Sequence, residues 1–409
     1  MGGGGGAADP RAVTPLRVLS LATLFPDAAR PNFGLFVEQS LRALAAQPGV
    51  ELTVVAPRGV PPWPLSLHLR YRALRMLPRQ DDWHGLHVHR PRFRLIPGRA
   101  ARNPAAIARA VLPLARRLHA VAPFAVVDAQ FFYPDGPAAM HIAAALGLPF
   151  SVKARGADIS HFGHTPATAP QISDAAIKAA GLLAVSAAMR DDMAAIGIDL
   201  AKVSVHYTGI DRARFCPGDR IAARAALARE LELGPGNRPL IASVGALIPR
   251  KGQALVIQAL PELPGVTYLL AGTGDSEGEY RAMAARLGVA DRVHFLGPVA
   301  HADLPQLYRA ADAIVMPSVS EGLANAWVEA LACGTPIVIS DAGGAAELVT
   351  SDVAGRIVER TPKAIAMAVR DLLATPHDAA AVSDTLGDRF SWERNGRELA
   401  EHLRRIVSL

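Results

Sequence analysis

Short apolar segments alternate with longer helical ones along most of the chain, and this alternation limits its possible folds more than any other sequence feature. It opens with an apolar segment at 16–21, a helical segment at about 35–47 and a second apolar segment at 51–56. Strand–helix–strand units of this kind form parallel sheets covered by their connecting helices. Six such alternations precede residue 210, and the second half of the chain repeats the pattern. The sequence therefore predicts an α/β fold with two Rossmann-like domains.

The domain boundaries follow from where the alternation is interrupted. With 409 residues, the chain is long enough for two ordinary α/β domains. The segment Cys-Pro-Gly-Asp at 216–219 has the composition of a linker. We expect a flexible tail at 1–12, an N-terminal domain at 13–213, a C-terminal domain at 214–390 and a last helical segment at 391–409.

Composition excludes several classes of protein. Half of the residues are hydrophobic and the mean hydropathy is +0.20, so the chain can bury a large core and is not globally disordered. Cys216 and Cys333 are the only cysteines, which argues against a disulfide framework or a cysteine zinc site and fits a reduced cytosolic compartment. The net charge of +6 favours anionic partners such as phosphorylated ligands or acidic lipids.

We expect no signal peptide and no membrane span. Residues 1–11 contain a glycine run without an apolar segment behind it. The longest uncharged stretch near spanning length, 136–152, is interrupted by Gly147 and Pro149 and is better explained as a helix followed by a strand. The sequence therefore predicts a soluble or peripheral protein.

Two glutamates follow a buried strand in the second half. The apolar segment 313–316 is a strand candidate, a polar loop follows it, and a helix is expected at about 324–333, ended by Gly334. Glu321 would lie at the carboxyl edge of the sheet, where open α/β sheets bind ligands, and Glu329 about two turns down the helix. The alternative is structural, with Glu321 capping the helix and Glu329 solvated on its outer face.

The segment from 58 to 102 is strongly basic, with ten arginines and only two acidic residues. Over 66–78, one face of the expected helix is apolar and consists of Leu67, Tyr71 and Leu74. The neighbouring face is basic and consists of His68, Arg72, Arg75 and Arg79. A helix of this kind can lie on an anionic membrane surface. The alternative is a solvated basic face over an ordinary core stripe. Charge alone would also allow nucleic acid, but no nucleic-acid-binding motif accompanies it, so we expect none.

Several motifs, in this order along the chain, resemble the retaining glycosyltransferases of family four. They are Asn-Phe-Gly at 32–34, Tyr-Pro-Asp-Gly at 133–136, Arg-Gly-Ala-Asp at 155–158, Thr-Gly-Ile-Asp at 208–211, Leu-Ile-Pro-Arg-Lys-Gly at 247–252, Glu-Gly-Leu at 321–323, the segment 329–338 and Gly-Gly-Ala-Ala-Glu at 343–347. The resemblance covers nearly the whole chain. It implies the GT-B fold, in which two Rossmann-like domains face each other across a cleft, the nucleotide-sugar binds the C-terminal one, and the last helix crosses back to the first.

The resemblance also implies roles for single residues. On the donor side, Glu329 would bind the ribose hydroxyls, and Glu321 would hold hydroxyls of the donor sugar near the backbone N–H groups of Gly322 and Leu323. Lys251 would pair with the diphosphate. The remaining candidates are Arg250 beside it, Gly34 in a loop that closes over the diphosphate, Gln130 near the transferred sugar, and Arg155 and Asp158 on the acceptor side.

Two positions depart from the family pattern. Members often carry Arg directly after the glycine of the lysine loop, and here that residue is Ala246. Many also carry His two residues after the position of Asp128, where this chain has Gln130. A glutamine can donate a hydrogen bond but cannot become charged, so no acid–base role is available there.

The resemblance predicts a retaining glycosyltransferase that moves a sugar from a nucleotide-diphosphate-sugar to a glycan or polyprenyl-linked acceptor, in cell-envelope or exopolysaccharide synthesis. It further implies that no metal or other cofactor is needed and that the enzyme is cytoplasmic, on the inner face of the membrane. The alternatives are a catalytically silent nucleotide-sugar-binding subunit and an epimerase or phosphorylase of the same fold. A dinucleotide-dependent oxidoreductase is excluded because the first strand lacks the glycine fingerprint.

Overall fold

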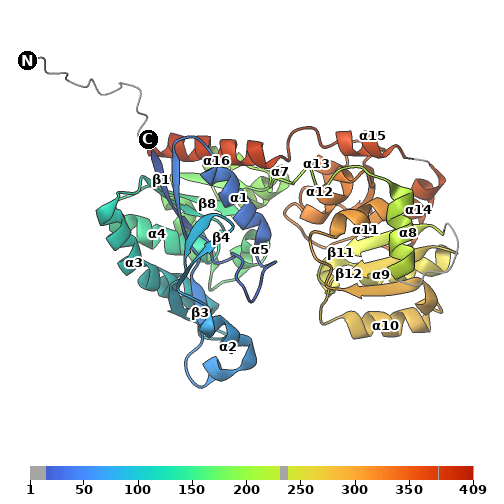
Figure 1. Cartoon of the computed structure of the whole chain (residues 1–409), viewed down its shortest axis with the longest axis horizontal. Coiled ribbons are helices and arrows are strands. Elements are labelled where there is room, and N and C mark those ends of the chain that lie inside the picture. The colour runs from blue at the N-terminus through green and yellow to red at the C-terminus, as the bar shows by residue number, and fades with distance from the viewer. Residues whose placement is uncertain (1–14, 231–237, 376, 409) are drawn as a thin grey trace, which may run out of the picture. The chain divides into compact units, whose positions relative to one another are not determined.

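The computed structural model describes residues 15–230, 238–375 and 377–408, which form two large sheets with helices packed on them (Figure 1). The tail expected at 1–12 lies outside the described residues. The chain divides into two compact units, the first comprising residues up to 152, 174–181 and 396–409, and the second comprising 153–173 and 182–395. The prediction of an α/β protein with parallel sheets in two domains is confirmed.

The first sheet has the strand order β10-β9-β8-β7-β1-β2-β5-β4. Its strands are β1 (Leu16–Leu21), β2 (Val50–Val55), β4 (Gln80–Trp83), β5 (Leu86–His89), β7 (Val126–Ala129), β8 (Phe150–Ala154), β9 (Gly181–Ala184) and β10 (Val203–Val205). In the centre, β1 pairs in parallel with β2 and β7, so that Val18 lies opposite Leu52 and Val126. Val18 and Val126 are fully buried, as expected for strands covered on both faces.

The second sheet has six parallel strands in the order β13-β12-β11-β14-β15-β16. They are β11 (Leu240–Val244), β12 (Thr267–Ala271), β13 (Val293–Gly297), β14 (Ala313–Met316), β15 (Ile337–Ser340) and β16 (Gly355–Val358). The order reverses between β11 and β14. The carboxyl ends of these two strands are therefore where a ligand is expected to bind.

Helices connect the strands throughout. They are α1 (Leu35–Ala45), α2 (Leu69–Met76), α3 (Asn103–Val121), α4 (Asp135–Leu146), α5 (Ala157–Ser160), α6 (Ala169–Lys178), α7 (Ala187–Ala195), α8 (Arg220–Glu230), α9 (Gln253–Ala259), α10 (Glu277–Arg286), α11 (Leu304–Ala310), α12 (Asn325–Ala332), α13 (Ala345–Leu348), α14 (Pro362–Ala374), α15 (Ala379–Asp384) and α16 (Trp392–Val407). Residues 396–409 belong to the first unit, where Arg404 Nη2 donates to Pro48 O over 2.6 Å.

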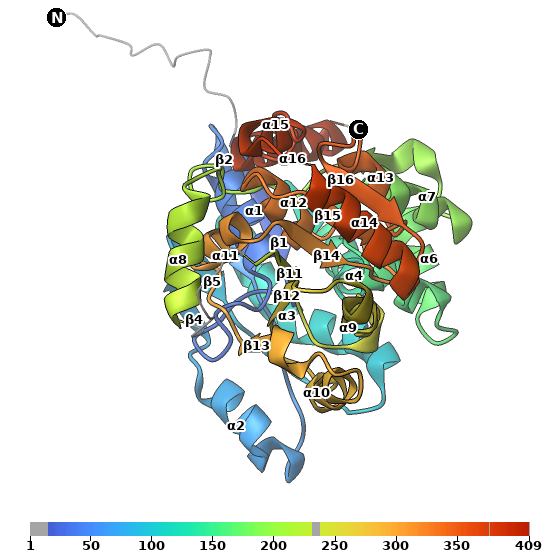
Figure 2. The same cartoon turned by 90° about the vertical axis from the view of Figure 1, so that its right-hand side faces the viewer.

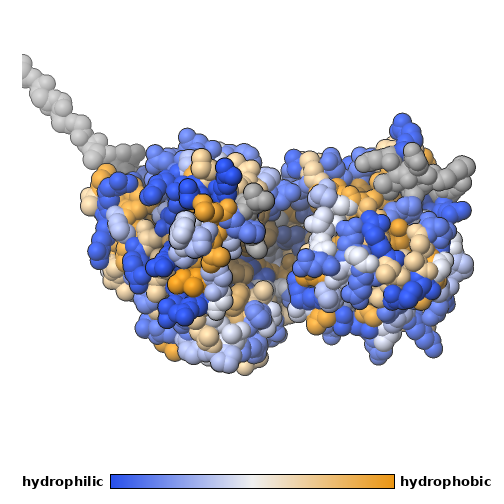
Figure 3. All heavy atoms as spheres, turned by 90° about the horizontal axis from the view of Figure 1, so that it is seen from below, coloured by the Kyte–Doolittle hydropathy of each residue, from blue (hydrophilic) through white to orange (hydrophobic). Residues whose placement is uncertain are grey.

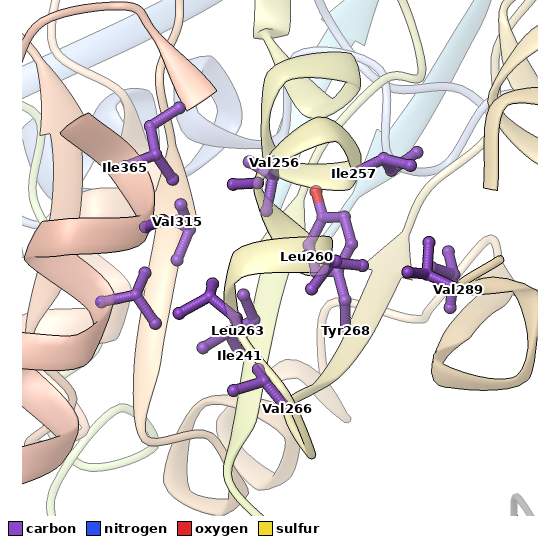
Figure 4. Close-up of a cluster of buried hydrophobic side chains, with 14 of the residues drawn as sticks. Ile241, Val256, Ile257, Leu260, Leu263, Val266, Tyr268, Val289, Val315 and Ile365 are labelled. Atoms are coloured by element: carbon purple, nitrogen blue, oxygen red, sulfur yellow. The ribbon is translucent and has the colours of Figure 1, made fainter. Parts of the chain in front are cut away.

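The core of the second unit lies between its sheet and helices α9, α10 and α14, which Figures 1 and 2 show packed over one face of the strands. Figure 4 shows how Val256 of α9, Tyr268 of β12 and Val315 of β14 converge there. Ile314, next to Val315 along its strand, points to the opposite face, since successive strand side chains alternate. Helices α11 and α12 contact the sheet on that opposite face.

The basic segment folds more elaborately than the sequence predicted. It contains the β4–β5 hairpin and a separate parallel pair, β3 (Arg58–Val60) with β6 (Arg92–Arg94). The single helix expected over 66–78 is wrong at its start, because residues 65–67 form a 3₁₀ turn and α2 begins only at Leu69. Arg58 and Arg90 are 4% and 1% exposed, so the segment is not basic on its surface alone.

Candidate functional site

The loop between β14 and α12 carries Glu321 at the carboxyl edge of the second sheet. Helix α12 begins at Asn325, and no side chain caps it. Glu321 therefore does not cap the helix, and the structural alternative for this residue is wrong. The helix ends before Gly334, which has φ of 82°, as the sequence predicted.

Lys251 lies directly against Glu321, although 70 residues separate them in the chain. Lys251 Nζ donates to Glu321 Oε1 over 2.6 Å, and the two side chains are 15% and 9% exposed. Arg250 Nη1 lies 3.6 Å from Glu321 Oε2 and also donates to Ser320 O. Two cations and one carboxylate thus meet at this edge, leaving an excess of positive charge suited to an anionic ligand.

Gly252 allows the lysine loop and the glutamate loop to lie this close. Its φ is 78°, and a Cβ atom added there would lie 2.2 Å from Pro317 O. Val319 N donates to Arg250 O over 2.8 Å, which fixes the two loops to each other. Only glycine meets both demands, positive φ and close backbone approach.

The loop at 272–274 packs against the start of the lysine loop. A Cβ atom at Gly272 would lie 2.0 Å from Gly245 O, and Leu247 N donates to Thr273 O over 3.0 Å. Residues 272–274 therefore form a tight turn beside the lysine loop. Ala246, where the family often has arginine, contributes its carbonyl oxygen, which accepts a 2.9 Å hydrogen bond from Gln253 Nε2.

Glu329 is held by two side chains that the sequence did not indicate as partners. Tyr308 Oη donates to its Oε2 and His301 Nε2 lies against its Oε1, each at 2.8 Å. Glu329 is 8% exposed, so the alternative of a solvated glutamate is wrong. Burial, followed by the Glu329 charge, raises the pKa of Tyr308 well above its ordinary value. Tyr308 therefore stays protonated and fixes one carboxylate oxygen as an acceptor.

If Glu329 binds the ribose of a nucleotide-sugar, as the family resemblance predicts, Tyr308→Phe should raise the KM for that donor about tenfold while kcat changes less than about twofold. The variant removes one hydrogen bond to a charged group, worth about 1.5 kcal/mol, and the cavity is otherwise filled. Steady-state kinetics with varied donor measures this. An unchanged KM would show that the orientation of Glu329 does not matter for donor binding.

Backbone groups of 322–323 are held by a second set of contacts. The carbonyl oxygen of Gly322 accepts from Ser186 Oγ at 3.1 Å and from Gly344 N at 2.8 Å. A Cβ atom at Gly322 would lie 2.5 Å from Arg155 O, so Arg155 and Gly322 touch through their backbones. Leu323 is buried beside them. Ser186 also caps α7 by accepting from Met189 N.

The Arg-Gly-Ala-Asp turn is rigid. Asp158 is fully buried and its carboxylate accepts from the backbone N–H groups of Arg155 and Gly156 at 2.7 to 3.1 Å. Gly156 has φ of 151°, which L-residues with side chains rarely adopt. Asp158 therefore shapes the loop that carries Arg155. An acceptor-side role for the two residues stays a prediction.

Glu347 is a further junction, which the sequence analysis named only as part of the motif at 343–347. Its carboxylate accepts from Tyr207 Oη at 2.6 Å and from the backbone N–H groups of Ala187 and Ala188 at the start of α7. Burial and the bond to Glu347 raise the pKa of Tyr207 to about 12. The helix dipole of α7 favours the carboxylate in this place. Glu347 thereby fixes the loop at 343–347 to the segment after β9.

Gln130 and Gly34 belong to the first unit. Gln130 is 1% exposed, and its Nε2 donates to Asp128 Oδ2, which also accepts from Ser20 Oγ at 3.3 Å. Gly34 precedes α1 with φ of 76°, and a Cβ atom there would lie 2.4 Å from Leu24 O. The closing-loop glycine is thus required by backbone packing, and Gln130 is oriented by Asp128.

Within the described parts of the chain, no group of three or more histidine, cysteine, aspartate or glutamate side chains is arranged to hold a metal ion. Among the helices that the structure describes, none combines the length and the hydropathy needed to cross a membrane.

Comparison with known families gives two matches that follow each other along the chain. The family described as Glycosyltransferase Family 4 matches residues 34–214, and the family described as Glycosyl transferases group 1 matches residues 228–386.

Curated relatives include a D-inositol 3-phosphate glycosyltransferase of Mycolicibacterium vanbaalenii, 36% identical over 230 residues, which are 50% of this chain and 50% of that one. A GDP-mannose-dependent alpha-(1-6)-phosphatidylinositol monomannoside mannosyltransferase of Mycolicibacterium smegmatis is 38% identical over 212 residues, 48% of this chain and 54% of that one. The chain thus spans about half the length of these relatives.

Solved structures match over nearly the whole chain. Sucrose-phosphate synthase from Thermosynechococcus elongatus has a TM-score of 0.76 at 20% identity, covering 96% of this chain and 99% of that one. Anabaena HepE in complex with UDP has a TM-score of 0.72 at 21% identity, covering 95% and 99%. At these identities the likeness concerns the fold, which is the one the sequence predicted.

Proposed function

Because the chain belongs to the group 1 glycosyltransferases of the family-4 type, we propose that it transfers a sugar from a nucleotide-diphosphate-sugar to a glycan or lipid-linked acceptor, with retention of the anomeric configuration. The observation that carries this proposal is the partly buried contact between Lys251 and Glu321 at the carboxyl edge of the second sheet. Arg250 supplies a second cation at the same place. The three side chains offer charges of both signs to a ligand that has a diphosphate and hydroxyl groups.

The proposed chemistry follows from these charges. As the bond between the anomeric carbon and the diphosphate oxygen breaks, its electron pair passes to the leaving diphosphate. Lys251 and Arg250 stabilise the negative charge that develops there. The acceptor oxygen bonds to the anomeric carbon on the face that the leaving group vacates, and its proton passes to the leaving phosphate. No separate general base is then required.

Glu321 and Glu329 take different parts of the donor in this proposal. When the diphosphate occupies Lys251, Glu321 accepts hydrogen bonds from sugar hydroxyls, supported by the backbone N–H groups of Gly322 and Leu323. Glu329, held by Tyr308 and His301, accepts from the ribose hydroxyls. A carboxylate oxygen has two lone pairs, so each Glu329 oxygen can keep its protein partner and accept one ribose hydroxyl. No metal or other cofactor takes part.

The known activities named for two relatives support this class of substrates. One acts on D-inositol 3-phosphate and another is a GDP-mannose-dependent mannosyltransferase of a phosphatidylinositol monomannoside. Anabaena HepE is solved with UDP and with UDP-glucose. We place the proposed reaction in cell-envelope or exopolysaccharide synthesis on the cytoplasmic face of the membrane.

The test for donor binding is a melting-temperature screen against UDP-, GDP- and ADP-sugars. A ligand that binds only the native state raises the melting temperature, by about 4 °C at ten times its Kd. We expect sugars of one nucleotide class to raise the melting temperature of the wild type but not that of Lys251→Met. The absence of any shift across the panel would contradict nucleotide-sugar binding.

We also propose that the α2 region docks on an anionic membrane. The segment exposes several large apolar side chains: Trp63, Leu65, Leu67 and Met76, which are 51% to 77% exposed. The basic residues Arg72, Arg75 and Arg79 are exposed beside them. Figure 3 views the first unit from the side on which α2 lies in Figure 1 and shows apolar side chains interspersed with hydrophilic ones. This combination favours an anionic interface over a merely solvated basic face.

We expect the triple charge reversal of Arg72, Arg75 and Arg79 to glutamate to reduce co-flotation with phosphatidylglycerol liposomes at least about tenfold, since each basic residue contributes about 1 kcal/mol near such a surface. A matched control reverses three exposed basic residues of the second unit, Arg281, Arg286 and Arg370. Equal flotation of the α2 variant and the wild type would contradict membrane docking by this segment.

A silent donor-binding subunit is the second candidate, and the two departures from the family pattern favour it. Ala246 stands where family members often have an arginine beside the lysine loop, so that cation is missing here. Gln130 stands where many members have a histidine, so a group that could become charged is missing as well. Such a protein would bind the donor without releasing the nucleotide. Donor binding and nucleotide release therefore separate the two candidates.

A further inference from the structure

Three arginines from distant parts of the chain gather at the carboxyl edge of the first sheet. Arg58 follows β2 and opens β3, Arg90 follows β5, and Arg30 lies in the loop after β1. Asp27, in that same loop, accepts from Arg30 Nη2 at 2.8 Å, and its Oδ2 lies 3.6 Å from Arg58 Nε. Asp81 of β4 accepts from Arg90 Nε at 2.7 Å. This edge is the ligand-binding edge of an open α/β sheet.

The arginine cluster (Arg30, Arg58 and Arg90) has more buried donors than the protein satisfies. Four of its nitrogens have no hydrogen-bond partner among the described residues: Arg30 Nε, Arg58 Nε, Arg58 Nη2 and Arg90 Nη2. Because a buried N–H group without an acceptor costs about 1 to 3 kcal/mol, four in one place indicate a missing acceptor.

Charge indicates that the missing acceptor is an anion. Three guanidinium groups face two carboxylates, Asp27 and Asp81, so one positive charge is uncompensated. Burial, followed by the neighbouring Arg90, lowers the pKa of Arg58 to about 10, although Asp27 and Asp81 act in the opposite direction. Glu38 does not supply the missing charge, because it has its own cation: Arg42 Nη1 lies 3.9 Å from Glu38 Oε1.

We infer that the arginine cluster binds a phosphate group, and that this phosphate belongs to the sugar acceptor. Guanidinium groups match phosphate oxygens in pairs of parallel hydrogen bonds, and a phosphate offers enough oxygens for donors that come from three side chains. Arg30 is the most exposed member of the cluster: its side chain is 38% exposed, and its guanidinium carbon lies 4.3 Å from the centre of the Phe33 ring. The phosphate would share Arg30 and Arg58 with Asp27.

The assignment of this phosphate to the acceptor rests on the proposed glycosyl transfer, whereas phosphate binding itself does not. Two sources share the chemistry, namely a soluble sugar phosphate and the phosphate of a lipid-linked acceptor. Either would anchor the acceptor at the sheet edge of the first unit through the arginine cluster.

Hydrogen–deuterium exchange with and without inorganic phosphate, at matched ionic strength in chloride, tests the inference. The wild type, Lys251→Met and Arg58→Gln are compared, with circular dichroism and thermal melting to check each fold. Lys251→Met removes phosphate binding at the donor site, so protection that persists in it reports the arginine cluster. We expect phosphate to protect the same segments in the wild type and in Lys251→Met: 26–34, 57–60 and 89–92.

In Arg58→Gln this protection should disappear, together with the phosphate-dependent rise in melting temperature of about 4 °C at ten times the Kd. If Arg58→Gln does not fold, Arg90→Gln replaces it. In either case, the segments that phosphate protects in Lys251→Met show whether the arginine cluster binds it. Protection confined to the lysine loop, no protection at all, or unchanged protection in Arg58→Gln would each overturn the inference.

The source of the phosphate is separated by two further arms, glucose 1-phosphate in solution and phosphatidylglycerol vesicles. If glucose 1-phosphate protects the three segments and the vesicles do not, the acceptor is a soluble sugar phosphate. If the vesicles protect them and glucose 1-phosphate does not, the acceptor is a lipid. If phosphate binds and no sugar transfer is found with any donor, the site stands and the proposed function fails.

Discussion

Replacement of Lys251 by methionine is expected to lower kcat/KM for the nucleotide-sugar by about 10² to 10³-fold. Methionine keeps most of the side-chain volume but removes the cation that lies 2.6 Å from Glu321 Oε1. In the proposed reaction this cation stabilises the leaving diphosphate, and the loss of one such group in an enclosed site costs about 2.7 to 4 kcal/mol. The assay measures released nucleotide at varied donor concentrations.

Two controls separate this effect from damage to the loop. Lys251→Arg keeps the charge and should retain more activity than Lys251→Met. Arg250→Gln removes a cation that is 45% exposed and 3.6 Å from Glu321, so its effect should be smaller than that of Lys251→Met. A Lys251→Met enzyme within about threefold of the wild type would show that the lysine does not stabilise the leaving group.

Replacement of Glu329 by alanine is expected to weaken donor binding by about 100-fold. The variant removes the proposed acceptor of the ribose hydroxyls and leaves Tyr308 Oη and His301 Nε2 without their partner. Two hydrogen bonds to a charged group are worth about 3 kcal/mol together. Titration calorimetry with UDP and GDP measures the affinity directly, and thermal melting reports the accompanying loss of stability, about 2 kcal/mol.

Glu329→Gln is the matched control because it keeps the shape and one acceptor oxygen. It should bind the nucleotide more tightly than Glu329→Ala, and its preference for UDP over 2′-deoxy-UDP should be smaller than that of the wild type. An undiminished preference in Glu329→Gln would mean that another group recognises the ribose.

The strand–helix alternation was predictable because both sheets are largely parallel and buried. Strands such as β14 and β15 consist of continuous or nearly continuous apolar residues, and glycine or proline marks the ends of several of the helices. The β4–β5 hairpin and the β3–β6 pair were not predicted, since their short strands contain arginine, aspartate and histidine. Arg58 and Arg90 looked like surface residues because their partners, Asp27 and Asp81, are set by tertiary contacts.

The candidate site was predictable only in part. Family resemblance selected Lys251, Glu321 and Glu329, and the structure brings the first two into contact. Tyr308 was missed because a tyrosine on the apolar face of α11 looks like any core residue. His301 lies seven residues earlier, and no local pattern in the sequence indicates that both side chains would contact Glu329.

Nucleotide release tests the central claim most directly. The purified chain is incubated with a panel of UDP-, GDP- and ADP-sugars and a membrane extract as acceptor, and the free nucleoside diphosphate and the anomeric configuration of the product are measured. We predict release from one donor class, retention of configuration in the product, and loss of release in Lys251→Met. Donor binding without release from any donor, or a product of inverted configuration, would contradict a retaining glycosyltransferase.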